Sequence, residues 1–323
     1  MKKSLSKKTP ILYLIVPCYN EQEVLPLTNK IFENKIIDLI KNKKISDKSK
    51  VLFVNDGSKD STWEIIKDIS KNSKHIEGIS LSKNRGHQNA LLAGLMEAKD
   101  LCDVTITMDC DGQHDINAVD MMIDNYQNGY EIVYGVRNQR QGDSFLKKIF
   151  SELYYKIINS LGADVIVNHA DYRLVSSKVL NEFKNFKEVN IFLRGLFPMV
   201  GFKSTIINYD QFDRKAGKSH YSISKMLTLA MDGITSLSIK PIRIITGFGL
   251  FVTLLSFIEI IYTIVSYFDG RTVQGWASMT CIICFVSGIQ LISLGVIGEY
   301  VGKTYMETKQ RPRYIINERT NKK

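Results

Sequence analysis

The first half of the chain alternates short, β-branched apolar runs with stretches whose apolar residues recur every three or four positions. The short runs predict strands, and the longer stretches predict amphipathic helices. This alternation predicts an α/β fold with a mostly parallel sheet and helices on both of its faces. The predicted strands are Ile11–Val16, Val51–Val54, Ile76–Leu81, Val104–Met108 and Ile132–Val136. The predicted helices are Glu23–Lys44, Ser61–Ser73, Gln88–Lys99 and Asn117–Asn128.

Two long apolar runs follow near the C-terminus, at about residues 244–268 and 276–297. A helix needs about 20 residues to cross a hydrocarbon layer about 30 Å thick, so each run is long enough to span a membrane. Together they predict a transmembrane hairpin. Their one charged residue, Glu259, has two interpretations. It contacts a partner span or the lipid phosphate region, or it lies near an interface and extends its carboxylate into it.

Two further segments are candidates for helices that lie flat on a membrane. Phe145–Leu161 gathers its apolar residues on one side, and Tyr221–Ile239 leads into the first long run. Packing of Phe145–Leu161 on the folded domain explains its pattern about as well. These patterns divide the chain into a domain at 1–220, a juxtamembrane helix at 221–243, two spans at 244–300 and a tail at 301–323.

The positive charge of the chain lies at its two ends. The 323 residues include 43 Lys and Arg against 33 Asp and Glu, a net charge of +10. Residues 1–8 carry +4 and residues 303–323 carry +5, which leaves +1 for the span between them. A nucleic-acid-binding domain carries its charge on the folded body, so nucleic acid is the weakest partner class. Basic ends fit a membrane surface, and they predict that the domain and the tail share the cytoplasmic side.

Composition adds two restrictions. The 44% apolar and 24% charged content excludes general disorder and fibrous repeats, and the length allows about two domains. The five cysteines are odd in number and suggest a reducing compartment. Cys281 and Cys284 have redox-like spacing, but they lie in an apolar run, which favours small buried side chains.

Polar or glycine-containing stretches follow four of the predicted strands. Ligands of open α/β sheets bind beyond the carboxyl ends of the strands, so these stretches predict a polar ligand site. Within the last one, Asp109 and Asp111 are two close carboxylates that repel unless a cation lies between them. Hard oxygen ligands select Mg²⁺ or Mn²⁺, which bridge substrate phosphates. A solvated turn is the common alternative for such a pair, and the position after the fourth strand favours the metal.

Two sets of short motifs follow in order along the chain. The first set is Val16–Glu21, Val54–Thr62, Asn84–Gly86 and Asp109–Gln113. The second set is Asp171–Leu174, Arg194–Leu196, Arg214-x-x-Gly217-x-Ser219 and Ile297–Gly302. The first set resembles family 2 glycosyltransferases with a GT-A fold. The second set, together with the C-terminal hairpin, resembles the polyprenyl-phosphate glycosyltransferases, the group of bactoprenol glucosyltransferase and dolichol-phosphate mannose synthase.

The resemblance implies roles for individual residues. The implied nucleotide-sugar site is Pro17, Tyr19, Glu21, Asp56, Asp109, Arg137 and Arg214. The implied metal site is Asp109, Asp111 and Gln113, and the implied catalytic residues are Asp111, Asp171 and Arg173. The chemistry agrees, since a tyrosine face stacks on a base, carboxylates accept from base or ribose groups, and arginines bind phosphates. In the alternative, Pro17 and Tyr19 shape a turn, and Asp56, Ser58 or Ser61 caps the following helix.

The implied reaction is direct, inverting displacement at the anomeric carbon, in which a polyprenyl phosphate oxygen attacks and the nucleoside diphosphate leaves. The resemblance favours glucose or N-acetylglucosamine from a UDP-sugar, undecaprenyl phosphate as acceptor, a homotetramer, and a multi-pass protein of the inner membrane. Asp171 has two interpretations. It acts as a base, or it orients Arg173 or the acceptor, because a phosphate monoester with a second pKa near ~6 is already ionised.

The chain departs from the family pattern at two positions. His220 stands where the family has Lys, so Lys215 or Lys218 would have to supply that charge, and Asp115 replaces a common Pro. Two other functions compete with the lipid-linked one. A processive polysaccharide synthase would carry a Gln-x-x-Arg-Trp motif and more spans, but neither Trp63 nor Trp276 lies in such a motif. A non-catalytic membrane scaffold is disfavoured by the complete set of site acids.

Overall fold

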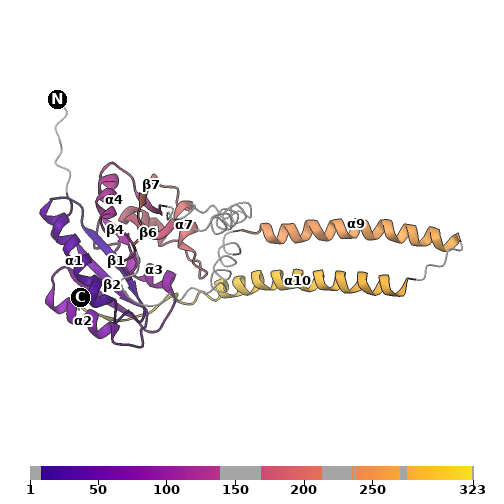
Figure 1. The fold of residues 1–323 in the computed structure, drawn as a ribbon, viewed down its shortest axis with the longest axis horizontal. Coiled ribbons are helices and arrows are strands. Elements are labelled where there is room, and N and C mark those ends of the chain that lie inside the picture. The colour runs from indigo at the N-terminus through magenta and orange to yellow at the C-terminus, as the bar shows by residue number, and fades with distance from the viewer. Residues whose placement is uncertain (1–8, 139–168, 213–234, 236–237, 270–274, 322–323) are drawn as a thin grey trace, which may run out of the picture.

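The computed structural model describes residues 9–138, 169–212, 235, 238–269 and 275–321. Figure 1 shows a domain of sheet and helices at one end of the molecule. Two long helices, α9 (Lys240–Phe268) and α10 (Trp276–Thr308), run side by side away from it. After α10 the chain returns to the domain, and the C-terminus lies beside α2 (Thr62–Asn72) (Figure 1).

An eight-stranded sheet forms the centre of the domain, in the order β7-β5-β6-β4-β1-β2-β3-β8. β6 is antiparallel to β4 and β5, β8 is antiparallel to β3, and the other neighbouring strands are parallel. The sheet is therefore mostly parallel, as predicted. Its strands are β1 (Leu12–Cys18), β2 (Lys50–Asn55), β3 (Ile76–Leu81), β4 (Val104–Thr107), β5 (Ile132–Arg137), β6 (His169–Ser176), β7 (Ser204–Tyr209) and β8 (Ile316–Arg319).

Helices cover both faces of the sheet, so its central strands are buried on both sides. The remaining helices of the domain are α1 (Leu25–Lys41), α3 (His87–Ala98), α4 (Ala118–Gln127), α6 (Ser177–Phe183) and α7 (Leu193–Met199). Leu12, Leu14 and Val16 of β1 belong to a core formed with α1, α2 and α4. The alternate residues Tyr13 and Ile15 belong to a second core, formed with α3, α6 and α7. Burial of both faces explains why these strands are continuous apolar runs in the sequence.

The five strands and four helices predicted for the first half are all present, with ends shifted by at most three residues. The elements after residue 168 were not predicted individually. β6 enters the sheet between β4 and β5 in the opposite direction, so its place depends on contacts far away in the sequence. It brings Asp171 and Arg173 beside the end of β4, where Thr107 pairs with Arg173.

The C-terminal helices keep large apolar side chains on their surface. On α10, Leu291, Ile292 and Leu294 are 64–70% exposed, and α9 exposes Phe251 and Leu254 similarly. Within the described residues, the segment Phe285–Thr308 is long and apolar enough to cross a membrane. Helices α9 and α10 agree in position with the predicted hairpin, although α10 extends beyond residue 297 to Thr308.

The predicted interfacial segment Phe145–Leu161 lies outside the described residues. The same holds for Tyr221–Ile239, apart from Thr235, Ser238 and Ile239.

The C-terminal tail is part of the central sheet as well as a basic segment. β8 pairs with β3, and the Thr320 backbone N–H donates to the Gly78 carbonyl at 2.9 Å. The Trp63 indole N–H donates to Glu318 at 2.9 Å, and Arg319 forms two hydrogen bonds with Glu97, at 2.8 and 3.0 Å. The tail therefore covers an edge of the sheet that would otherwise present unpaired backbone groups.

Candidate functional site

Four loops meet at one edge of the sheet, because β4, β1, β2 and β3 are parallel neighbours. Each loop follows the carboxyl end of its strand, and these are the polar stretches that the sequence identified as a ligand site. Gly57 lets two of them approach closely. Its φ is +62°, and a Cβ there would lie 2.4 Å from the Lys83 backbone carbon. Any larger residue at this position would push the loops after β2 and β3 apart.

Reciprocal hydrogen bonds join the loops after β1 and β2. The Asn20 N–H donates to Ser58 Oγ at 3.0 Å, and the Lys59 N–H donates to Asn20 Oδ1 at 2.9 Å. The Glu21 N–H donates to Thr62 Oγ1 at 2.8 Å. Asn20 has a φ of 55°, a conformation that asparagine tolerates better than most residues. The two loops therefore form one rigid wall of the site.

The predicted nucleotide residues on this wall differ in exposure. Pro17 is buried in β1 opposite Val54, so it shapes the strand end. The Tyr19 ring is 41% exposed and is free to meet a planar ligand. Glu21 is half-buried.

Asp56 uses both carboxylate oxygens on the loop after β3. It accepts hydrogen bonds from the Arg85 N–H at 2.8 Å and the Gly86 N–H at 2.9 Å. Burial raises its pKa, and these two N–H groups oppose the rise. The alternative role as a cap is not observed, because α2 has no side-chain cap at Ser61 and Ser58 accepts from Asn20. Asp56 therefore fixes the loop that leads into α3.

The acidic loop after β4 is held in place by backbone contacts and ring stacking. Asp111 is buried, and its Oδ1 accepts from the Gln113 N–H at 3.0 Å. His114 stacks on the Tyr172 ring at 4.9 Å, and its Nδ1 accepts from the Asp109 N–H at 3.3 Å. The Asp109 carboxylate stays 32% exposed. Burial alone would raise the pKa of Asp109, but His114 and His87 outweigh it and lower the pKa.

The donor set of this loop fits a divalent cation. Two carboxylates lie two positions apart with one of them accessible, and Mg²⁺ or Mn²⁺ needs only one or two carboxylates when phosphates and water complete its shell. The Gln113 amide oxygen accepts from Gln211 Nε2 at 3.3 Å. Among the described residues, no group of three or more His, Cys, Asp or Glu side chains could hold a metal by itself. A cation here would therefore depend on a phosphate-bearing ligand.

His87, the first residue of α3, was not selected from the sequence. Its Nε2 lies 3.7 Å from Asp109 Oδ1 and 3.6 Å from Asp171 Oδ2, so it stands between the two acidic groups. Burial lowers its pKa, but Asp171 and Asp109 outweigh this and raise it. The signal that could have found it is its place directly after the Asn84–Gly86 motif.

Asp171 on β6 is surrounded by donors. It forms ion pairs with Arg173 and, at 2.9 Å, with Arg194 Nη2, and it accepts from Gln88 Nε2 at 3.2 Å. Burial alone would raise its pKa, but Arg194, His87 and Arg173 hold the pKa well below its usual range. Asp171 is therefore an ionised carboxylate at neutral pH.

The two arginines beside Asp171 differ in what they can reach. Arg173 is 1% exposed, donates to the Leu193 carbonyl at 3.1 Å and lies 5.0 Å over the Phe197 ring. It forms an ion pair with Asp171 and, because it is buried, is not open to a ligand. Arg194 is 25% exposed and sits at the surface of the cluster.

Of the two predicted phosphate-binding arginines, the structure describes Arg137 and does not describe Arg214. Arg137 ends β5 and is half-buried, and its Nε donates to the Tyr209 hydroxyl at 3.2 Å. Its positive charge contributes to the low pKa of Asp109, so it belongs to the same site. Arg214, with Lys215, Lys218 and His220, lies outside the described residues.

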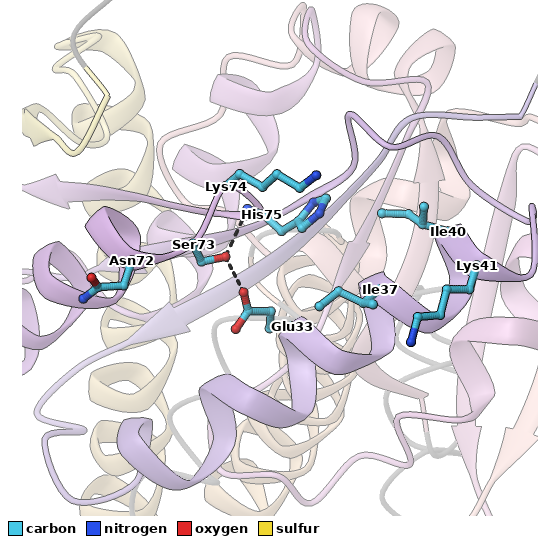
Figure 2. A pocket seen from close by; sticks show the side chains of 8 residues that line it. All are labelled: Glu33, Ile37, Ile40, Lys41, Asn72, Ser73, Lys74 and His75. Carbon is cyan, nitrogen blue, oxygen red and sulfur yellow. Dashed lines mark hydrogen bonds between the residues drawn. The ribbon is translucent and has the colours of Figure 1, made fainter.

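A separate cavity of about 420 Å³ lies between α1 and the turn before β3. Figure 2 shows Glu33 of α1 accepting a hydrogen bond from Ser73 beside it, with Ile37 and His75 among the lining residues. Because β3 begins at Ile76, this cavity is at the amino end of the strand, on the edge of the sheet opposite the acidic loop. It is therefore not part of the candidate site.

Comparisons with known proteins agree with this architecture. The chain matches the profile of Glycosyl transferase family 2 over residues 13–183 and that of the GtrB C-terminal hairpin over residues 240–304. It is 44% identical over 313 residues to the uncharacterized glycosyltransferase YkoT of Bacillus subtilis (strain 168). That alignment covers 97% of this chain and 93% of the relative.

A second relative is the bactoprenol glucosyl transferase of Shigella phage SfX, 37% identical over 311 residues, with coverage of 95% and 98%. A solved structure, glucosyl-3-phosphoglycerate synthase from Mycobacterium tuberculosis, aligns with a TM-score of 0.46 and 14% identity. That alignment covers 71% of this chain and 77% of the other. The two sequence relatives are thus similar to this chain over nearly their whole length.

Proposed function

The chain belongs to glycosyl transferase family 2, and from this membership and the geometry of its site we propose that it transfers one hexose from a UDP-sugar to a polyprenyl phosphate. Relatives named bactoprenol glucosyl transferase and the match to the GtrB hairpin support this acceptor. Undecaprenyl phosphate is the proposed lipid, and glucose or N-acetylglucosamine the proposed sugar. The product would be a lipid-linked sugar for modification of a cell-envelope glycan.

The observation that carries the proposal is the place of His87 between Asp109 and Asp171, at 3.7 and 3.6 Å. A displacement needs a leaving-group side and a nucleophile side around one carbon atom. The acidic loop with Asp109 suits the leaving diphosphate, and the cationic cluster around Asp171 suits an incoming phosphate. His87 lies between the two sides and is close to both.

The donor would lie on the wall made by the loops after β1 and β2. Tyr19 presents an exposed ring on which a base can stack, and Glu21 can accept from base or ribose groups. Asp56 acts through the backbone of Arg85 and Gly86, whose position it fixes. Arg137 would add positive charge near the diphosphate.

Asp109 and Asp111, with Gln113, would hold Mg²⁺ or Mn²⁺ together with the diphosphate. When bound, such a cation stabilises the negative charge that develops on the leaving group. The residues of the chain contribute independently of it, since Arg137 and His87 also bring positive charge to this side of the site.

The acceptor phosphate would bind to Arg194 and His87. One of its oxygens attacks the anomeric carbon as the bond from that carbon to the diphosphate oxygen breaks, and the electron pair leaves with UDP. The attack inverts the configuration, so an α-linked donor gives a β-linked product. The phosphate is already ionised, with a second pKa near ~6, so no base has to remove a proton. Asp171 would orient Arg194, and Arg173 would hold Asp171.

We also propose how the chain is arranged relative to the membrane. Residues 1–220 would form the catalytic domain, 221–243 a juxtamembrane helix, 244–300 a hairpin of two spans and 301–323 the tail. The domain and tail would share the cytoplasmic side of the inner membrane. The exposed apolar surface of α9 and α10 supports this arrangement, because lipid can cover it.

The test incubates membranes containing the protein with a panel of labelled nucleotide sugars, undecaprenyl phosphate and Mg²⁺ or Mn²⁺. We expect a labelled, chloroform-soluble product that disappears with a chelator and falls at least about 100-fold in Asp111→Asn. Asp47→Asn, a surface change of the same kind, should leave activity unchanged. Water-insoluble polymer would favour a processive synthase, and unchanged lipid glycosylation in Asp111→Asn would favour a scaffold.

A further inference from the structure

Glu307, in the last turn of α10, contacts a segment of the catalytic domain 117 residues away in sequence. Both of its carboxylate oxygens lie 2.8 Å from the Val189 N–H, and Oε1 also accepts from the Asn190 N–H at 2.9 Å. The Asn190 side-chain amide donates to the same oxygen at 3.1 Å. A carboxylate that accepts several N–H bonds is a strong anchor, because each bond is charge-assisted.

The other end of the same segment is held by the chain that follows α10. Arg313 Nη2 donates to the Phe186 carbonyl at 2.6 Å. Residues 186–190 are thus attached at two points to the part of the chain that leaves the long helix. Figure 1 shows this end of α10 against the domain, while the rest of the helix extends away from it.

The anchored segment leads directly into the acceptor side of the site. Leu193 begins α7, and its carbonyl accepts from Arg173 while its N–H donates to Gln88 Oε1 at 3.0 Å. Arg194 follows, with its Nη2 2.9 Å from Asp171 Oδ2. Three residues therefore separate the Asn190 anchor from the arginine that we assign to the acceptor phosphate.

The donor side is held by different contacts. Asn20, Ser58 and Lys59 join the nucleotide loops to each other, and Asp56 fixes the loop after β3. The hydrogen bonds of Glu307 go to Val189 and Asn190. A change at Glu307 should therefore act on the acceptor side alone.

We propose that Glu307 is a positioning residue for the lipid acceptor, which sets the place of Arg194 relative to the membrane helix. This inference rests on the proposed function. The phosphate of a polyprenyl lipid is fixed at the depth of the bilayer surface by its hydrocarbon chain. Arg194 can meet it only if the α7 segment is held at a matching depth, and α10 is the element that runs into the apolar layer. Precise placement of reacting groups is worth large rate factors, so a loose anchor is costly.

The test compares Glu307→Gln, Glu307→Asp and the control Glu64→Gln in purified protein with both substrates varied. Glu64 lies on α2, is 71% exposed and lies 2.7 Å from Lys67, so its change matches the charge loss and leaves the contacts of Glu307 intact. We expect Glu307→Gln to raise KM for undecaprenyl phosphate about tenfold, with KM for the nucleotide sugar within about twofold of wild type. Glu307→Asp should recover part of the loss, and Glu64→Gln should match wild type.

A second readout follows the anchor itself by amide hydrogen exchange. In Glu307→Gln the amides of Val189 and Asn190 should exchange faster, while those of β8 keep their protection and show that the fold is intact. An equal rise in both KM values, an unchanged acceptor KM, or the same effect in Glu64→Gln would overturn the proposal. If the wild-type protein makes no lipid-linked sugar from any donor, the proposed function fails instead.

Discussion

At the centre of the site, the Asp171 carboxylate meets the guanidinium groups of Arg173 and Arg194 and the ring of His87. These contacts outweigh the effect of burial and hold the Asp171 pKa well below its ordinary value of about 3.9. A general base works best when its pKa lies near the working pH. Of the two roles considered for Asp171, orientation of the acceptor site is therefore favoured over proton abstraction.

This role gives a prediction for pH dependence. Because its folded-state pKa is depressed, Asp171 stays ionised from about pH 5 upward, and its protonation cannot produce an acid limb near neutrality. We expect Asp171→Asn to lower kcat/KM for the acceptor about 10- to 100-fold, with the same pH profile as wild type between pH 6 and 8.5. The measurement is initial rate against pH for both proteins. An acid limb with a midpoint near pH 7 in wild type that is lost in Asp171→Asn would restore the role as a base.

At the scale of elements, β8 makes the tail part of the catalytic domain. Backbone pairing with β3, the Trp63–Glu318 hydrogen bond and the Arg319–Glu97 pair all join it to the sheet. A tail that only brought positive charge to a membrane surface would not need these contacts.

Removal of the tail should therefore lower the thermal stability of the domain. We expect a chain that ends at Thr308 to lose about 5 °C or more in Tm, because β3 becomes an exposed edge. The control keeps β8 and removes three charges, with Arg311→Gln, Lys322→Gln and Lys323→Gln. Its Tm should stay within about 1 °C of wild type. Equal losses in the two proteins, measured by thermal unfolding in detergent, would show that charge rather than strand pairing matters.

The sequence predicted those elements whose signal is local. β1 to β5 and α1 to α4 follow from periodicity, and the polar stretches after the strands come together at one end of the parallel strands. β6 and β8 were missed as elements of the sheet because their partners lie far away in the sequence. His87 and Glu307 were missed for the same reason, since each acquires its role only where two distant segments meet. The motif residues Asp56 and Arg173 were found, but their burial and hydrogen bonds became visible only in the structure.

At the scale of the whole molecule, the charge of +10 separates into two basic ends and a nearly neutral body. Two of the C-terminal basic side chains contact the domain. Arg313 donates a hydrogen bond to the Phe186 carbonyl, and Arg319 forms an ion pair with Glu97. The start of α9 and the end of α10 both lie at the domain (Figure 1). If the hairpin spans the bilayer, the domain and tail must therefore share one side, and the end of α9 and the start of α10 must lie toward the other.

Topology can be tested with epitope tags in intact cells. A tag inserted directly after Asp269, at the far end of α9, should be cleaved by external protease. A tag after Lys323 should be cleaved only when the cells are opened. Protection of both tags in intact cells would contradict a spanning hairpin and favour helices that lie on the inner surface.

The mass of the lipid product tests the central claim most directly. Purified protein in detergent is incubated with undecaprenyl phosphate, a UDP-hexose and Mg²⁺ or Mn²⁺, and the extracted lipid is analysed by mass spectrometry. We predict one new species, heavier than undecaprenyl phosphate by a single hexosyl group, that an α-linked donor yields in the β configuration. No lipid adduct with any UDP-sugar, or a ladder of several hexosyl additions, would contradict single transfer to a polyprenyl phosphate.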